Sequence, residues 1–295
     1  MRPEIARFSL WSVTVDGRSR VGHQYWDKII WVVAAYNHFL VTGDQAFLHQ
    51  AYFCAKNTIA ELEASAFERH YGLFMGPAVF QDGIAGYDEP ICDPENKSSY
   101  VLDHKNSTAI KCLSTNCIYY AAYRALAAMS ELEGDGLAAE FERRGKMLRA
   151  AIRKNLYDAN GNKLNYLLDH RGVVHPYQEA LGVAFAGLSG VVSPSEMSRI
   201  VRGAYTSDFG IPCVYPSFPR FSTAQPGRHN AIIWPFVNAF YADAALQAGE
   251  RAVFESELRN MASLAIKYGP DNFQEVYNMT TGAPDGGWQR GENGG

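Results

Sequence analysis

Apolar residues recur at helical spacing along most of the chain, and the segments that carry this pattern come in pairs. In the first pair, Gly43 and Asp44 separate two apolar segments, and they are typical of a helix stop and a new N-cap. The paired segments are residues 25–43 and 45–67, 116–135 and 136–158, the two halves of 177–203, and the two halves of 231–269, which turn at Gly249. The pattern therefore predicts four helical hairpins.

Within each pair the first segment is the more apolar and aromatic, whereas the second carries charge on one side, as in residues 141–154. This difference is typical of inner and outer helices. The pieces between the pairs are too short and irregular to build a large sheet. We expect an all-α ring of hairpins with the first helices lining the centre and short β-hairpin connections. A stacked solenoid also uses helical hairpins, but the chain shows no fixed repeat period.

Composition narrows the class of protein. With 295 residues, 47% of them hydrophobic, the chain can bury a substantial core, and we expect residues 1–295 to form a single domain. The net charge of -4 comes without a basic stripe, so nucleic acid is not an expected partner. The five cysteines lack metal-like spacing, and we expect buried thiols. No motif for zinc, for another metal or for an organic cofactor is found, and none is expected.

The first 13 residues contain no apolar run of signal-peptide length, and no later stretch reaches the ~20 apolar residues of a membrane span. We therefore expect a soluble, unexported protein with no membrane contact, cytoplasmic if the chain is complete.

Polar and aromatic residues that do not fit a core pattern gather just before the first helix of each hairpin. In a closed ring of up-and-down hairpins these leading connections lie at one end, so their side chains are expected to converge on one pocket. The clusters are residues 23–28, 114–116, 175–179 and 228–235, with a further cluster at 76–90 in a long connection.

The composition of these clusters favours a sugar as the ligand. Aromatic rings pack against the apolar faces of pyranose rings, while amide, carboxylate and imidazole groups hydrogen-bond the hydroxyls. The residues expected to line the pocket are Trp26, Asp27, Phe80, Asn116, Gln178, His229, Asn230, Trp234 and Trp288. Other roles remain open for four of these residues. Trp26 could be a core aromatic and Asp27 a helix-capping carboxylate. Asn116 could be an N-cap, and His229 could be a surface histidine.

Four segments, taken in order, resemble the trehalase and processing α-glucosidase relatives, which include bacterial mannosylglycerate hydrolases. The resemblance covers residues 22 to 289. The segments are HYGLFMGPAVFQDG (70–83), STNCIYYAAYRALAAMSELEGD (114–135), RHNAIIWPFVNAF (228–240) and NFQEVYNMTTG (272–282).

The resemblance implies an (α/α)6 barrel and exo-acting hydrolysis that inverts the anomeric centre. It implies twelve helices where eight are predicted, so we expect a truncated chain or an abbreviated family member. Such inversion needs a carboxylic acid and a carboxylate roughly 6.5 to 9.5 Å apart. The matching residues are Asp82 as the acid and Glu275 as the base.

The family's usual Gly-Trp-Asp is replaced here by Phe80-Gln81-Asp82, and Asp88 remains an alternative acid. We expect the apolar neighbours of Asp82 to raise its pKa. Tyr277 or Asn278 would orient Glu275. The resemblance also adds Asp88, Tyr277 and Gln289 to the residues expected to contact the substrate.

Two other functions remain open. One is a catalytically silent carbohydrate-binding or scaffold domain on the same barrel, and the other is a sugar epimerase or lyase, which would not need Glu275. A ring without its closing helix would expose apolar faces of the first and last hairpins, so self-association is a further expectation. The residues on those faces are Ile29, Ile30, Val33, Phe236 and Phe240.

Overall fold

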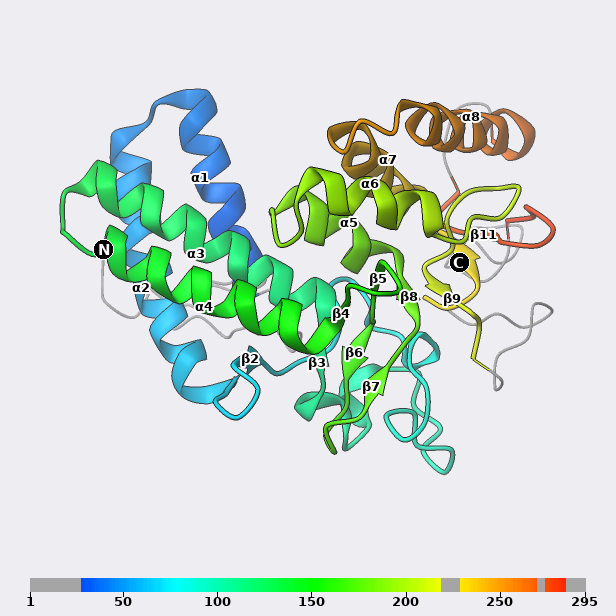
Figure 1. Ribbon diagram of the computed structural model, residues 1–295, viewed down its shortest axis with the longest axis horizontal. Helices are drawn as coiled ribbons and strands as arrows, with labels where there is room; N and C mark the ends of the chain where they lie inside the picture. The colour runs from blue at the N-terminus through cyan, green and yellow to red at the C-terminus, as the bar shows by residue number, and fades with distance from the viewer. Residues whose placement is uncertain (1–27, 219–228, 270–273, 285–295) are drawn as a thin grey trace.

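The computed structural model describes residues 28–218, 229–269 and 274–284, and helices dominate it (Figure 1). Within these ranges the helices are α1 (Ile30–Thr42), α2 (Gln45–Ser65), α3 (Leu113–Glu133), α4 (Ala138–Leu156), α5 (Ala180–Leu188), α6 (Pro194–Gly203), α7 (Pro235–Gln247) and α8 (Arg251–Tyr268). They form the four predicted hairpins, in the predicted order.

The turn inside the first hairpin follows from its two predicted residues. Gly43 takes φ 68, the left-handed conformation that glycine adopts without steric cost, and ends α1. The Asp44 carboxylate then accepts a 2.9 Å hydrogen bond from the Phe47 amide and caps α2. The stop and the cap predicted from the sequence are both confirmed.

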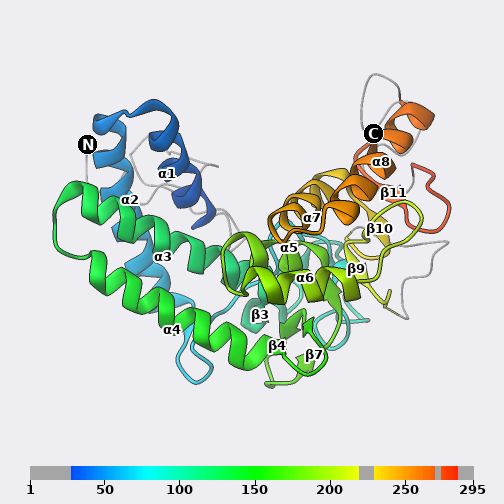
Figure 2. The same ribbon diagram turned by 45° about the horizontal axis from the view of Figure 1, so that its top comes forward.

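The first helices of the hairpins form an inner row. Helix α1 contacts α3, α3 contacts α5, and α5 contacts α7, while α2, α4, α6 and α8 each pack on their own partner. Figure 2 shows the hairpins following one another along an arc from α1 and α2 to α7 and α8. Inner helix α3 is buried on several sides, whereas outer helix α4 buries a single stripe that includes Phe141, Leu148 and Ile152. The predicted division into inner and outer helices is confirmed.

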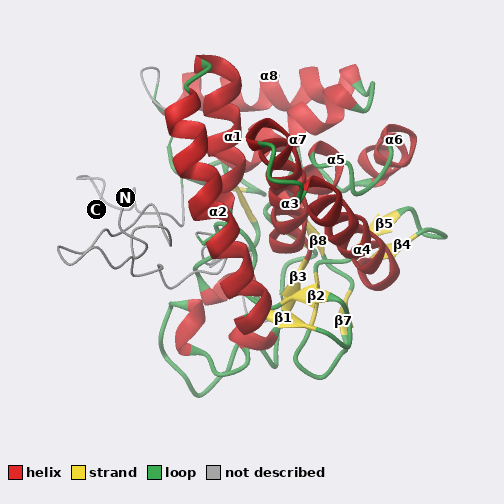
Figure 3. Cartoon of the chain, turned by 90° about the vertical axis from the view of Figure 1, so that its left-hand side faces the viewer, coloured by secondary structure: helices red, strands yellow, loops and turns green. Residues whose placement is uncertain are grey.

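Short antiparallel strands join the connections between helices, and several lie at one end of the helices (Figure 3). They are β1 (Phe67–Glu68), β2 (Leu73–Phe74), β3 (Lys111–Cys112), β4 (Tyr157–Asp158), β5 (Lys163–Leu164), β6 (Leu167–Leu168), β7 (Val174–His175), β8 (Gln178–Glu179), β9 (Val214–Tyr215), β10 (Ile232–Ile233) and β11 (Tyr277–Asn278).

The strand pairs link the leading connections to one another. Strand β3, just before α3, pairs with β6 in the segment before α5. Strand β8, just before α5, pairs with β9 in the segment before α7. Strand β10, just before α7, pairs with β11 after α8. The described segments that carry predicted site clusters therefore meet at one end of the helical arc, and residues 23–27 lie outside the described residues.

The core runs along the inner helices, and all five cysteines are buried, as predicted. Among the residues expected on exposed apolar faces, Phe236 is 38% exposed, but Ile29 is fully buried. The prediction of an exposed Ile29 was wrong, because this residue precedes α1 and packs into the main core.

Within the described ranges, every helix is too short or too polar to cross a lipid bilayer.

Candidate active site

Asp82 lies in a tightly held loop that follows β2. The Val79 amide donates a 3.0 Å hydrogen bond to the Ser114 hydroxyl in the first turn of α3. The Tyr87 hydroxyl accepts from the Ala78 amide at 3.0 Å and donates to the Gln81 carbonyl at 2.7 Å. These hydrogen bonds fix the backbone on both sides of Phe80. They therefore restrict the position of the backbone at Asp82.

The Asp82 carboxyl meets His229, which comes from the segment before α7. Asp82 Oδ1 and His229 Nε2 are 2.9 Å apart, and the side chains are 36% and 3% exposed, respectively. The imidazole therefore supports the carboxyl from the protein side, while part of the carboxyl faces solvent. Phe80 and His229 both have left-handed backbones, at φ 59 and 65. Non-glycine residues in this region carry strain and cluster at functional sites.

Aromatic rings form a wall beside this pair. The Trp234 ring centroid lies 5.0 Å from that of His229 and 5.5 Å from that of Phe236. The Phe80 ring packs edge-on against Phe236 at 5.0 Å. Phe80 and Trp234 are both half-buried, so each keeps some surface for contact with a ligand. The structure thus brings together Phe80, Asp82, His229 and Trp234, four of the predicted residues.

Glu275 lies just before β11, the strand that pairs with β10 ahead of α7. Ile233 pairs with Tyr277 in this antiparallel ladder, and Glu275 precedes Tyr277 by two residues. The Tyr277 hydroxyl accepts a 3.0 Å hydrogen bond from the Gln274 amide and closes the turn around Glu275. Glu275 itself is half-buried.

Besides His229, three of the predicted ligand-contacting residues are buried. Asn116 accepts a hydrogen bond from the Phe74 amide at 2.8 Å and donates to the carbonyls of Phe74 and Cys112 at 3.0 and 2.9 Å. Asn230 and Tyr277 are also fully buried, and Asn230 accepts from the Phe218 amide at 3.4 Å. These contacts give the three side chains the role of holding backbone segments rather than that of reaching a sugar.

Asp88 and Gln178 occupy other positions. Asp88 accepts a 2.6 Å hydrogen bond from the Tyr177 hydroxyl. Gln178 is bound by both ends of its amide to the backbone of Tyr205, at 2.9 and 3.1 Å, and lines a separate hollow of about 340 Å³. Gln178 thus belongs to a surface different from that of Asp82. Trp26, Asp27, Trp288 and Gln289 lie outside the described residues.

The structure adds Glu179, which sequence reasoning missed. Side chains of successive strand residues point to opposite faces, so when Gln178 faces outward, Glu179 points into the protein. Glu179 is fully buried, its carboxylate accepts a 3.3 Å hydrogen bond from the Ser114 amide, and burial raises the pKa of Glu179 to about 8. The available signal was a lone carboxyl directly before the wholly apolar helix 180–188.

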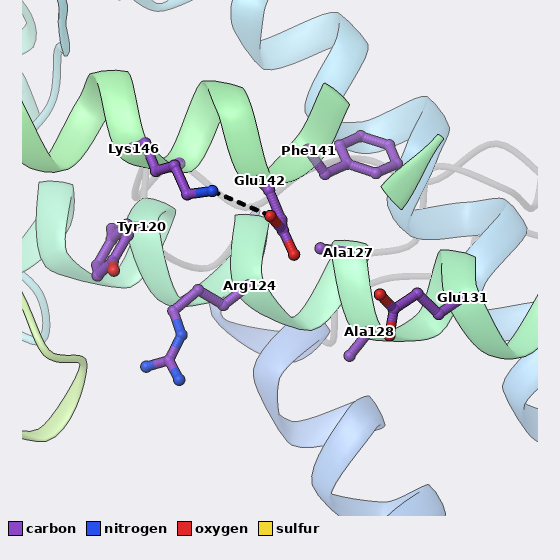
Figure 4. Close-up of a pocket in the computed structure, with 9 residues that line it drawn as sticks. Tyr120, Arg124, Ala127, Ala128, Glu131, Phe141, Glu142 and Lys146 are labelled. Atoms are coloured by element: carbon purple, nitrogen blue, oxygen red, sulfur yellow. Dashed lines mark hydrogen bonds and ion pairs between the residues drawn. The ribbon is translucent and has the colours of Figure 1, made fainter. Parts of the chain in front are cut away.

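Another hollow, of about 300 Å³, lies between α3 and α4 (Figure 4). Tyr120, Arg124 and Phe141 line it, and a 3.1 Å ion pair joins Lys146 to Glu142 at its edge. No described member of the predicted site lines this hollow.

Within the described ranges, no group of three or more histidine, cysteine or acidic side chains is arranged to hold a metal ion.

The sequence model of the mannosylglycerate hydrolase MGH1-like glycoside hydrolase domain matches residues 16–293, almost the whole chain. The chain belongs to the MGH1-like glycoside hydrolase family. No curated protein matches the sequence.

Solved structures similar to this MGH1-like domain share its fold. A sialidase matches with a TM-score of 0.72 and 16% identity, over 96% of this chain and 26% of that one. A GH63 mannosylglycerate hydrolase from Thermus thermophilus in complex with glucose matches with a TM-score of 0.67 and 17% identity, over 94% and 75%. A neutral trehalase from Saccharomyces cerevisiae matches with a TM-score of 0.61 and 12% identity, over 86% and 58%.

These neighbours confirm the fold class that the sequence predicted. The MGH1-like domain is a mostly helical glycoside hydrolase domain of the (α/α)6 type, and it shares this fold with a GH63 mannosylglycerate hydrolase and with a trehalase. The chain spans about a quarter of the length of the sialidase and about three quarters of the mannosylglycerate hydrolase.

Proposed function

We propose that this chain is an exo-acting, inverting glycoside hydrolase in which Asp82 is the general acid and Glu275 the general base. The observation that carries the proposal is the pair of Asp82 and His229, 2.9 Å apart beside Trp234. It presents a partly exposed carboxyl, held by a buried imidazole, next to an aromatic surface that suits a sugar ring.

Asp82 would give its proton to the glycosidic oxygen as the bond to the anomeric carbon breaks. Glu275 would take a proton from a water molecule, and the resulting hydroxide equivalent would attack the anomeric carbon from the opposite face. The new hydroxyl carries the inverted configuration, and the leaving group departs as a neutral alcohol. The proton that Asp82 loses is balanced by the one that Glu275 gains.

The register of β10 and β11 supports Glu275 as the second carboxylate. The pairing holds the segment that carries Glu275 beside the residues just before α7, and these residues include Trp234 and His229, the partner of Asp82. Glu275 would then border the same cavity as Asp82. The closed turn at Tyr277 would limit the movement of Glu275 and keep it oriented toward the attacking water.

The proposed substrate is a small glycoside bound at its non-reducing end. The names of the similar structures, a mannosylglycerate hydrolase bound to glucose and a trehalase, favour a gluco- or manno-configured sugar. A half-buried aromatic pair, Phe80 and Trp234, offers area for one pyranose ring.

The test is a screen of nitrophenyl glycosides, trehalose and mannosylglycerate, followed by proton NMR of the first sugar released. Turnover that yields the inverted anomer supports the proposal. Clean retention of configuration contradicts the roles of Asp82 and Glu275. Saturable sugar binding without turnover would instead identify a carbohydrate-binding domain on the same fold.

A further inference from the structure

Glu179 lies at the centre of the contacts that support the Asp82 loop. It ends β8, directly before α5, and its side chain is fully buried. Its Oε2 accepts a 3.3 Å hydrogen bond from the Ser114 amide. The helix makes room for this carboxyl through Gly182, because a Cβ there would collide with Glu179 Oε2.

Ser114 and Gln81 connect Glu179 to the acid loop. The hydroxyl of Ser114 accepts from the Val79 amide at 3.0 Å, so the residue that meets Glu179 through its backbone holds the loop through its side chain. Gln81, the residue directly before Asp82, is 3% exposed, and its side chain lies close enough to the Glu179 carboxyl to influence the pKa of Glu179. Glu179 is therefore tied to the Asp82 loop through Ser114 and borders the residue directly before Asp82.

Within the described part of the chain, no positive charge balances Glu179. The titratable groups that face it are phenols and thiols, whose pKa values are all raised by burial, so they are neutral near pH 7. These groups are Tyr87, Tyr166, Cys112, Cys117 and Cys213. An isolated buried carboxylate is too costly to persist, so such a group keeps its proton.

The hydrogen-bonding pattern independently indicates a proton. Among the described residues, Glu179 Oε1 and Gln81 Oε1 are both buried acceptors with no donor. A carboxylate charge on Glu179 would leave both oxygens unsatisfied, which costs free energy. A proton on Glu179 converts one of the two acceptors into a donor.

We propose that Glu179, in its protonated form, is a positioning residue for Asp82 and holds the acid loop through Gln81 and Ser114. The inference rests on the proposed function of Asp82. Loss of the Glu179 proton would place an unpaired charge behind the loop and disturb the orientation of the acid. Two protons would then be needed for turnover on the alkaline side, one on Asp82 and one on Glu179.

The experiment compares wild type with Glu179→Gln, Glu179→Ala and the control Glu257→Gln. Glu257 is also buried, and burial likewise raises its pKa, but it binds Asn238 and the Ile211 amide rather than the acid loop. The measurements are the dependence of kcat on pH and a thermal melt of each variant, with the substrate that the glycoside screen identifies.

In the wild type, log kcat should fall with a limiting slope of two on the alkaline side. Glu179→Gln keeps the shape and neutrality of the side chain, so kcat near pH 6 should stay within about threefold of wild type and the slope should drop to one. Glu179→Ala should lower kcat by up to about 100-fold at every pH with KM little changed, because the loop is misplaced. Glu257→Gln should leave the profile unchanged. Superimposable alkaline limbs in wild type and Glu179→Gln would overturn the proposal.

A second measurement needs no substrate. Infrared difference spectra between wild type and Glu179→Gln should show a protonated carboxyl at pH 6 that disappears by pH 10. A carboxylate signal already at pH 6 overturns the inference, even if hydrolysis is found. An inactive wild type with the protonated signal would contradict the hydrolase and leave the protonation established.

Discussion

Asp82 Oδ1 and His229 Nε2 are 2.9 Å apart, although the two residues are separated by 147 positions in the chain. The imidazole is almost fully buried, whereas the carboxyl is partly exposed. A buried partner that holds an exposed carboxyl restricts its rotation, so His229 is expected to act through Asp82 rather than on the sugar.

Replacing His229 should therefore lower kcat more than it changes KM. We expect about a tenfold loss of kcat in His229→Ala, because the carboxyl of Asp82 loses its support. In the Asp82→Asn background, His229→Ala should cause no further loss of kcat, because His229 acts only through the Asp82 carboxyl. His70, an exposed histidine, provides the control His70→Ala, which should behave as wild type. Additive losses in the double variant would mean that His229 acts separately from Asp82.

The aromatic wall makes a prediction about substrate binding. Trp234→Ala should raise KM roughly tenfold and leave kcat less affected, because the indole supplies apolar contact to the sugar in both the ground state and the transition state. The matched control is Phe53→Ala on α2, whose ring is 41% exposed. KM is measured by steady-state kinetics. An equal rise in KM in both variants would contradict the contact between the Trp234 ring and the sugar.

Asn116 makes a prediction about stability. Its amide satisfies both backbone groups of Phe74, so Asn116→Ala leaves a buried donor and a buried acceptor without partners. We expect a loss of roughly 2–4 kcal/mol in the free energy of unfolding, measured by urea titration. Asn155→Ala, which removes only hydrogen bonds to two carbonyls at a partly buried site, should cost about 1 kcal/mol. Equal costs would show that Asn116 does not hold the loop.

Glu179 should also make folding stability depend on pH. Its pKa is about 8 in the folded protein against an ordinary value of 4.5, so the folded state retains a proton that the unfolded state loses. Stability should therefore be fully present below pH 4.5 and fall as the pH rises to 8, by up to about 1.4 kcal/mol per pH unit from this group.

Glu179→Gln removes that proton exchange. The difference in unfolding free energy between this variant and wild type should grow from about pH 5 to about pH 8, in favour of the variant, in parallel urea titrations. A difference that stays constant over this range would mean that Glu179 is already ionised in the folded protein.

Much of the helical framework could be predicted from the sequence, because local chemistry decides it. The stop at Gly43 and the cap at Asp44 need only backbone geometry and one side-chain hydrogen bond. The position of the leading connections at one end was also predictable from the alternation of inner and outer helices, and the pairs of β3 with β6 and β8 with β9 join described connections there.

The direction of individual side chains was not predictable in the same way. Gln178 and Glu179 are adjacent, and only the register of β8 with β9 decides which of them enters the protein. Asn116 was expected to face the pocket, but α3 begins at Leu113, one turn earlier than predicted, and its first turn binds the loop at Phe74. Both outcomes depend on contacts between segments that are distant in the chain.

The assignment of Asp82 and Glu275 is tested most directly by the hydrolysis of two substrates that share a sugar, an unactivated glycoside and the corresponding glycosyl fluoride. Fluoride leaves with little need for a proton, whereas both substrates need an activated water. We predict that Asp82→Asn loses ~10²–10⁴-fold on the glycoside and far less on the fluoride, that Glu275→Gln loses activity on both, and that Asp88→Asn resembles wild type. Selective loss on the glycoside in Asp88→Asn, with Asp82→Asn unaffected, would contradict the account.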